Sequence, residues 1–173
     1  MASSSTLAEL FEGFRHEAFR LETLEDYSGS GNVDAFRAFQ AGRQRPEGYN
    51  SEWVAELRGL AHRGKRVYRV HVLKRPLTEY LRFELGWGYW TNMTGGEEFF
   101  ILDVTDGTDP LEGVPDFWLF DSEDTAVMRY DDAGAFLGAD VLPPDRAATY
   151  RAYRETALAH AEPFTDWWAK YGE

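Results

Sequence analysis

The sequence predicts an α+β fold: a mixed, largely antiparallel sheet of about five strands, flanked by helices. Three observations indicate this class. Residues 66–84, RVYRVHVLKRPLTEYLRFE, have the pattern of a strand, a proline-marked turn and a helix. Four short strand-like segments follow, and their short connections favour antiparallel pairing. Helical periodicity dominates before residue 64 and again after residue 145.

Length and composition predict one ordered domain that does not cross a membrane. The chain has 173 residues, enough to bury a substantial core, and 16% of them are aromatic, which argues against disorder. It has no cysteine, so we expect no disulfides, as suits a cytoplasmic protein. The N-terminus lacks the cationic start and apolar run of a signal peptide. No apolar stretch approaches the about 20 residues of a spanning helix.

We expect this single domain, residues 1–173, to have four parts. They are a flexible tail at 1–5, a helical N-terminal part at 6–64, an α/β core at 65–163 and an aromatic C-terminal segment at 164–173.

Three helices are predicted in the N-terminal part. Thr6 and Glu9 form a capping-box pattern, and an apolar stripe at helical spacing then continues to Leu21. The other two helices cover residues 33–39 and 50–64, each closed by a glycine.

Four strands and a helix are predicted after the central unit. The strands cover residues 99–102, 117–120, 125–130 and 135–142, and the last two form a hairpin. A helix over 145–161 follows, and the aromatic C-terminal segment is expected to dock back on the domain.

The run GWGYW at residues 86–90 sets two glycines among three large aromatic residues. It predicts a kinked helix end or a covering loop. Two interpretations stay open, an ordinary core plug or an aromatic surface on which a planar ligand stacks.

The candidate binding residues lie mostly on the central strand and helix. Alternation puts Tyr68, Val70 and Val72 on one apolar face of the strand, and Arg69 and His71 on the other. That second face either lines a polar cleft or meets solvent and pairs with nearby acids. For a cleft, the candidate residues are Arg20, Arg69, His71, Arg75, Tyr80, Arg82 and Glu84.

The charge distribution sets limits on the partners. A formal net charge of −12 repels phosphate backbones and anionic membrane surfaces, so we expect no direct binding to nucleic acid or membrane. Positive charge concentrates in one stretch, at Lys65, Arg66, Arg69, Lys74, Arg75 and Arg82. That stretch either receives an anion or an acidic partner surface, or it pairs with the protein's own carboxylates.

Familiar catalytic motifs are missing from the sequence. It has no GxSxG, HExxH, Walker or GxGxxG pattern. The four histidines lie far apart in the sequence, with no pair at i, i+4 for zinc. We therefore predict no metal site and no cofactor, and we favour a protein that is not an enzyme.

Five segments together resemble an uncharacterised domain family of actinobacteria: FRHEAFRLETLEDY, RVHVLKRPLTEYLRFEL, FFILDVT, DFWLFD and MRYDDAGAFLGA. The similarity extends from Leu7 to Phe164. Members are often encoded near helix-turn-helix regulators, which implies a regulatory role and a regulator protein as partner. Residues 65–163 are also similar to one half of the phospholipase D-like fold, but His71 and Lys74 are spaced HxxK rather than HxK. This departure puts hydrolysis in doubt.

These observations lead to three hypotheses. The first is a non-catalytic regulatory or binding module that recognises a partner protein or an anionic small ligand, with arginine as the bidentate donor. The second is a hydrolase or transferase acting on a phosphorylated substrate, with His71 as acid and base. The third is an acidic decoy for a DNA-binding regulator, which rests on net charge alone.

Overall fold

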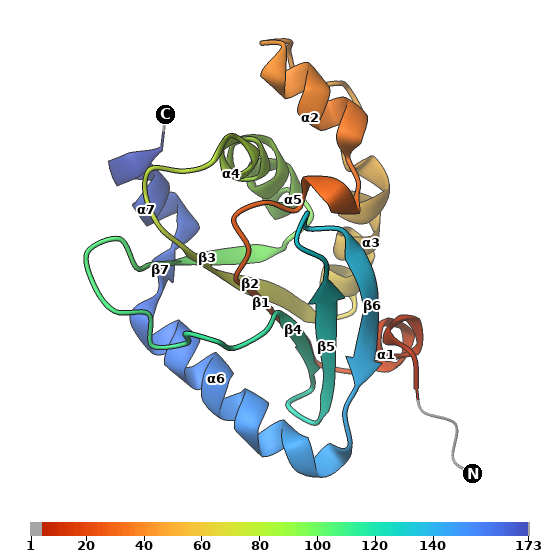
Figure 1. Ribbon diagram of the computed structural model, residues 1–173. Helices are drawn as coiled ribbons and strands as arrows, with labels where there is room; N and C mark the ends of the chain where they lie inside the picture. Colours follow the sequence, from red (N-terminus) through yellow and green to blue (C-terminus); the bar gives the residue numbers. More distant parts are fainter. Residues whose placement is uncertain (1–4, 173) are drawn as a thin grey trace.

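The computed structural model describes residues 5–172 and has an α+β fold built on one mixed sheet (Figure 1). Seven strands pair in the order β6-β5-β4-β1-β2-β3-β7, where about five were predicted. The β1·β2 and β2·β3 pairs are parallel, and the other pairs are antiparallel. The predicted flexible tail at residues 1–5 lies outside the described residues, except for residue 5.

Five strands form close to their predicted bounds. They are β2 (Arg66–Leu73), β3 (Glu98–Asp103), β4 (Phe117–Phe120), β5 (Asp124–Tyr130) and β6 (Phe136–Val141). The two strands that the sequence patterns did not indicate are β1 (Glu17–Glu22) and the short β7 (Glu162–Pro163).

The predicted N-terminal helix through Leu21 is wrong in its second half. Helix α1 (Leu7–Gly13) begins with the expected capping box of Thr6 and Glu9, but the chain then turns and enters β1 at the centre of the sheet. The start of β1 is fixed by Asp121, whose carboxylate accepts the backbone N–H groups of residues 15–17 at 2.7–3.0 Å. Burial acts to raise the pKa of Asp121, but these donors together hold it below its ordinary value.

Helices cover both faces of the sheet. Those of the N-terminal half are α2 (Val33–Gln40) and α3 (Ser51–His62), with a 3₁₀ turn η1 (Ser28–Ser30) before them. After β2 come α4 (Glu79–Phe83), the π-helix η2 (Glu84–Tyr89) and α5 (Trp90–Met93), which form one continuous helical segment. The last elements are the 3₁₀ turn η3 (Pro144–Arg146), α6 (Ala147–His160) and α7 (Phe164–Tyr171). Over residues 5–172, no helix has both the length and the apolar character that crossing a membrane requires.

One face of the sheet packs on α6 (Figure 1). Phe19 and Leu21 of β1, Tyr68 and Val70 of β2 and Phe117 of β4 point to this side and form one apolar cluster with the helix. The predicted apolar face of β2 is confirmed.

The opposite face of the sheet lies beneath the remaining helices. Strand alternation turns Arg20 and Glu22 of β1, Arg69 and His71 of β2 and Trp118 of β4 toward this side. All five are buried or partly buried, so the second face of β2 does not meet solvent.

Candidate functional site

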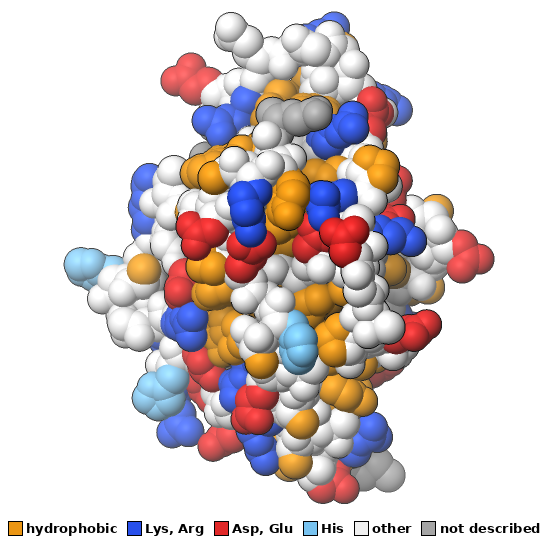
Figure 2. Space-filling model, turned by 90° about the vertical axis from the view of Figure 1, so that its left-hand side faces the viewer, with side chains coloured by type: hydrophobic (Ala, Val, Ile, Leu, Met, Phe, Trp, Pro, Cys, Tyr) orange, Lys and Arg blue, Asp and Glu red, His pale blue; other side chains and the backbone are white. Residues whose placement is uncertain are grey.

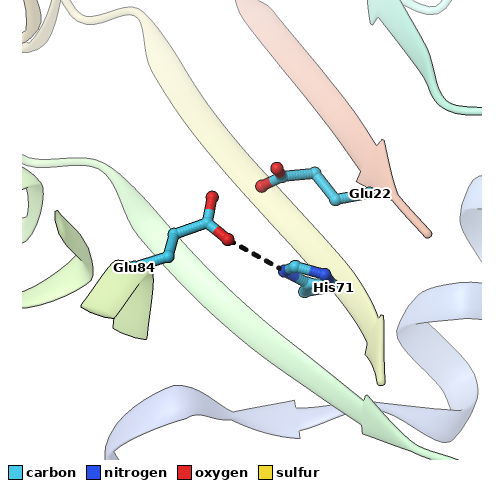
Figure 3. A group of neighbouring side chains, drawn as sticks. All are labelled: Glu22, His71 and Glu84. Atoms are coloured by element: carbon cyan, nitrogen blue, oxygen red, sulfur yellow. Dashed lines mark ion pairs between the residues drawn. The ribbon is translucent and has the colours of Figure 1, made fainter. Parts of the chain in front are cut away.

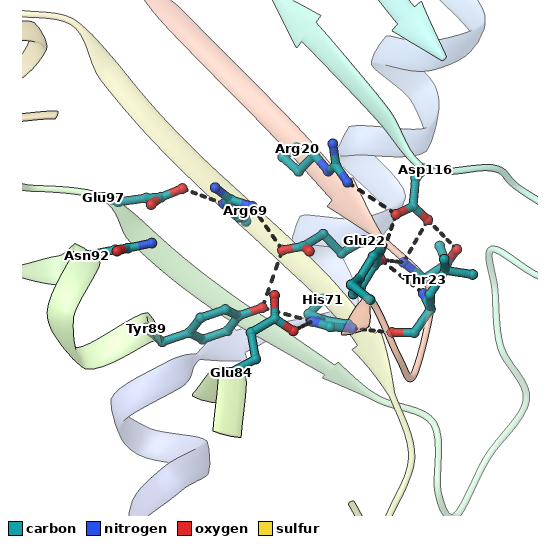
Figure 4. A network of polar contacts seen from close by, with 12 residues as sticks. Arg20, Glu22, Thr23, Arg69, His71, Glu84, Tyr89, Asn92, Glu97 and Asp116 are labelled. Atoms are coloured by element: carbon teal, nitrogen blue, oxygen red, sulfur yellow. Dashed lines mark hydrogen bonds and ion pairs between the residues drawn. The ribbon is translucent and has the colours of Figure 1, made fainter. Parts of the chain in front are cut away.

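The strand register brings four polar side chains together at the centre of the sheet (Figure 4). Arg20 of β1 pairs in register with Arg69 of β2, and Glu22 pairs with His71. Because the side chains of paired residues lie on the same face, two guanidinium groups stand next to a carboxylate and an imidazole. We call these four residues, with the acids and Tyr89 that contact them, the polar cluster.

Both arginines of the polar cluster are already paired. Arg69 donates through Nε to Glu97, and its Nη1 lies 3.2 Å from Oε1 of Glu22. Burial acts to lower the pKa of Arg69, but the carboxylates of Glu97 and Glu22 raise it above its ordinary value. Arg20 donates through Nη2 to the Tyr130 hydroxyl at 2.6 Å and lies 3.4 Å from Oδ2 of Asp116.

Glu22 is the acid nearest to the middle of the polar cluster, and its side chain is 3% exposed. Burial acts to raise its pKa, but Arg69, followed by His71 and Arg20, lowers it below the ordinary value. Glu22 is therefore a carboxylate at neutral pH.

His71 is fully buried, and both of its ring nitrogens have partners. Nε2 lies 2.9 Å from the Leu24 carbonyl oxygen, an acceptor, so Nε2 carries the proton. Nδ1 lies 2.8 Å from the Tyr89 hydroxyl and 3.9 Å from Oε2 of Glu84 (Figure 3). In the neutral tautomer, the Nδ1 lone pair therefore faces Tyr89 and Glu84.

The π-helix η2 brings Glu84 and Tyr89 to the same place. On an α-helix, residues five apart are separated by about 140° around the axis, and their side chains diverge. On a π-helix, i and i+5 are joined by the backbone hydrogen bond and lie nearly one above the other. Glu84 and Tyr89 are its first and last residues, and both point at His71 (Figure 4).

Glu84 is the least satisfied acid of the polar cluster. Its Oε2 atom is buried and has no hydrogen-bond partner among the described residues. Burial, and after it the nearby Glu22 carboxylate, raises the pKa of Glu84 well above its ordinary value. Its side chain as a whole is 17% exposed, so Glu84 lies at the edge of the cluster although its Oε2 atom is buried.

Acids outnumber bases in the polar cluster. Four acidic side chains face two guanidinium groups; the acids are Glu22, Glu84, Glu97 and Asp116, and the bases are Arg20 and Arg69. Since unpaired buried charge is costly, this excess of carboxyl groups favours a positive charge or a hydrogen-bond donor in the vicinity.

A cavity of about 370 Å³ adjoins the polar cluster, within the size range of small-molecule sites. Its lining combines aromatic with polar side chains, among them Tyr49, Trp53, Arg69, Glu84, Asn92 and Trp118. A second cavity of about 200 Å³ shares Asn32, Tyr80 and Glu84 with the first and reaches Arg20 and Glu22. Glu84 thus borders both cavities.

Five of the seven candidate binding residues meet in this region: Arg20, Arg69, His71, Tyr80 and Glu84. The other two, Arg75 and Arg82, line a separate groove of about 530 Å³ together with Trp87, Trp168 and Tyr171. The structure therefore does not bring all the candidate arginines to one opening.

The two arginines of this groove differ in their contacts. Arg75 pairs with Asp103 at 2.7 Å and Asp106 at 3.1 Å, and it stacks on Tyr171. Arg82 is exposed and makes no ion pair with any described residue. Figure 2 views the side of the molecule on which α7 lies, and hydrophobic side chains form small patches there among basic and acidic ones.

Sequence reasoning missed four members of the polar cluster: Glu22, Tyr89, Glu97 and Asp116. Glu22 was assigned to a helix, on which it would not share a face with Arg20. A short signal was present, because Phe19, Arg20, Leu21 and Glu22 alternate apolar and polar, but it covers only these last residues of β1.

Comparison with protein families gave a match. A family model described as a domain of unknown function, DUF6879, matches residues 5–169. No curated protein matches the chain.

Proposed function

The chain belongs to the DUF6879 family of domains of unknown function, and we propose that it is a non-catalytic binding module. In this proposal, the cavity above the polar cluster takes a small ligand that carries a positive charge or several hydrogen-bond donors. One observation supports it best: the acids of the cluster outnumber its bases, and Oε2 of Glu84 has no hydrogen-bond partner among residues 5–172.

The lining of the cavity suits a planar group. Aromatic side chains supply flat surfaces for stacking, and Asn92 and Glu84 supply polar atoms at its edges. An anionic ligand fits this cavity less well, because Arg69, the arginine in its lining, already holds the carboxylates of Glu97 and Glu22.

Small organic cations provide the first test. We expect some members of a panel of alkylammonium, guanidino and aromatic amine compounds to raise the melting temperature, while carboxylates of matched size do not. At 100 times its Kd, a ligand stabilises the fold by about 2.7 kcal/mol, which corresponds to about 5–10 °C for a domain of this size.

Two glycine variants provide the control. Gly88 lines the cavity, and a Cβ there would lie 3.6 Å from the Tyr49 hydroxyl, so Gly88→Val fills the space that the ligand needs. Gly107 is exposed, and a Cβ there would contact nothing within 4 Å, so Gly107→Val should respond like the natural protein. An equal response from both variants, or no response to any cation, would rule out the cavity as the site.

A second candidate function is supported by Arg82. Its guanidinium group, which makes no ion pair within residues 5–172, lines the same groove as Trp87 and Trp168, which suits an anionic group attached to an aromatic ligand. Recognition of an anionic small ligand, predicted from the sequence, is therefore proposed for this groove.

Phenyl phosphate is a suitable probe for the groove. We expect Arg82→Ala to weaken its binding, measured by calorimetry, about tenfold, because one charge-assisted hydrogen bond is lost. Arg58→Ala, an exposed arginine on α3, is the matched control and should bind like the natural protein. Equal affinities of Arg82→Ala and Arg58→Ala would count against the groove.

The other hypotheses have less support from the geometry. As an acid and base on a phosphorylated substrate, His71 would have to reach the substrate, but its side chain is fully buried. The acidic decoy, the helix-turn-helix regulator as partner, the actinobacterial origin, the phospholipase D-like resemblance and the cytoplasmic location stay predictions.

A further inference from the structure

Three side chains of the polar cluster converge like the ligands of a metal ion. One oxygen of Glu22, one oxygen of Glu84 and a ring nitrogen of His71 lie within 4.8 Å of one another (Figure 3). Ligand atoms about 2.1 Å from a tetrahedral metal ion are about 3.4 Å apart. The two glutamate side chains have three rotatable bonds each. Small rotations about these bonds can therefore bring the ligand atoms from separations of up to 4.8 Å to about 3.4 Å.

His71 is held in the orientation that a metal ligand needs. Metal-bound histidines usually donate their second N–H to a carbonyl or carboxylate, which fixes the ring and raises the basicity of the coordinating nitrogen. Nε2 of His71 makes this contact with the Leu24 carbonyl, at 2.9 Å. Nδ1 then faces Glu84 and Glu22, and an ion bound there would replace its hydrogen bond with the Tyr89 hydroxyl.

Tyr89 supplies a further oxygen at the same point. Its hydroxyl lies 2.8 Å from Nδ1 of His71 and 3.4 Å from Oε1 of Glu22. Its ring stacks on Phe99 with centroids 3.8 Å apart, which holds the hydroxyl in place. The π-helix therefore delivers two oxygen donors, from Glu84 and Tyr89, to one imidazole nitrogen.

The composition of the polar cluster favours a cation. Four carboxyl groups stand against two guanidinium groups, so acidic groups outnumber basic ones. The buried Oε2 atom of Glu84 has no hydrogen-bond partner among residues 5–172, as expected for an oxygen whose partner is an ion.

We propose that Glu22, His71 and Glu84 bind one divalent transition-metal ion, with the Tyr89 hydroxyl as a fourth donor. This inference rests on the proposed function, because it names the class of cation that the acids of the polar cluster hold. One imidazole and two carboxylates suit Zn²⁺, Co²⁺ or Mn²⁺, whereas Ca²⁺ and Mg²⁺ prefer oxygen ligands alone. The sequence did not predict this site, since its three ligands come from β1, β2 and η2.

The test uses the full chain without an affinity tag, treated with a chelator and then freed of it. Addition of Co²⁺ should give visible d–d absorption bands that saturate at one equivalent, and Zn²⁺ should abolish them. In a ¹⁵N–¹H spectrum of the imidazoles, Zn²⁺ should shift the His71 nitrogens and leave those of the exposed His16, His62 and His160 in place.

Isosteric variants test the ligand set. We expect Glu22→Gln and Glu84→Gln each to weaken Zn²⁺ binding at least about 100-fold, since even second-shell changes cost 10–100-fold. The matched controls are Glu56→Gln and His62→Gln, both exposed on α3, and they should bind Zn²⁺ like the natural protein. Circular dichroism shows whether each variant is folded.

Two results would overturn the metal site. One is a folded natural protein that gives no saturable Co²⁺ bands, and the other is Zn²⁺ binding that survives in folded Glu22→Gln and Glu84→Gln. If Co²⁺ does not bind but an organic cation does, the metal site fails and the proposed function stands. If neither binds, both fail.

Discussion

Replacing Arg69 by methionine is expected to lower the free energy of unfolding by about 3–5 kcal/mol. The guanidinium group of Arg69 lies between Glu97 and Glu22, whose side chains are 0% and 3% exposed. Methionine keeps the length of the side chain but leaves two acids buried without their partner. Such a loss costs far more than the intact ion pair gains, because both partners were already removed from water. Equilibrium unfolding in urea measures the effect.

The same strand offers a matched control for this prediction. Arg66 lies three residues earlier on β2 and makes a bidentate pair with Glu98, but both side chains are more than 40% exposed. We expect Arg66→Met to cost less than about 1 kcal/mol, as exposed ion pairs do. Adding Glu97→Gln to Arg69→Met should restore part of the loss. If Arg69→Met and Arg66→Met cost the same, the polar cluster does not hold buried charge.

Replacing Trp167 by alanine is expected to cost about 3–5 kcal/mol as well. Trp167 on α7 is completely buried in the apolar cluster that contains Phe164, Phe99 and Tyr89. Its indole N–H also donates to Asp103 at the end of β3, at 2.9 Å. The substitution would leave a cavity and remove this hydrogen bond.

Trp90 is the control for this second prediction, because 37% of it is exposed. We expect Trp90→Ala to lower the free energy of unfolding clearly less than Trp167→Ala. The exposed part of the Trp90 ring is already in water, so its removal costs no buried apolar surface. A loss of less than about 1 kcal/mol in Trp167→Ala would mean that α7 is not part of the folded core.

Local patterns predicted most of the strands but not the centre of the sheet. β2 and β4 were recognised because β-branched and aromatic residues fill short segments bounded by turn residues. β1 was missed because Phe14, Ala18 and Leu21 also fit a helical stripe that continues from α1. Both faces of β1 are covered, and a strand of this kind loses the simple alternation that distinguishes it from a helix.

Only part of the candidate site could be predicted from the sequence, again because local patterns do not show how the strands pair. Arg69 was found because it interrupts an apolar strand, but its acidic partners come from β1 and the turn before β3, and the acid that pairs with Arg20 lies just before β4. Pairing among these elements depends on the topology of the sheet, which no local pattern contains. A search for a period of 3.6 residues also does not detect a π-helix, although the unusual run GWGYW overlaps this one.

The central claim is that Glu84, unlike Arg69, serves binding rather than the stability of the fold, and Glu84→Gln tests it most directly. Oε2 of Glu84 has no hydrogen-bond partner among the described residues, so the folded chain gains little from its charge. The measurement is the free energy of unfolding of this variant in urea, beside its affinity for the cation that the natural protein binds. We predict an unfolding free energy within about 1 kcal/mol of the natural protein and a loss of cation binding. A loss of about 3 kcal/mol or more in stability, with cation binding intact, would contradict the claim and make Glu84 a structural residue.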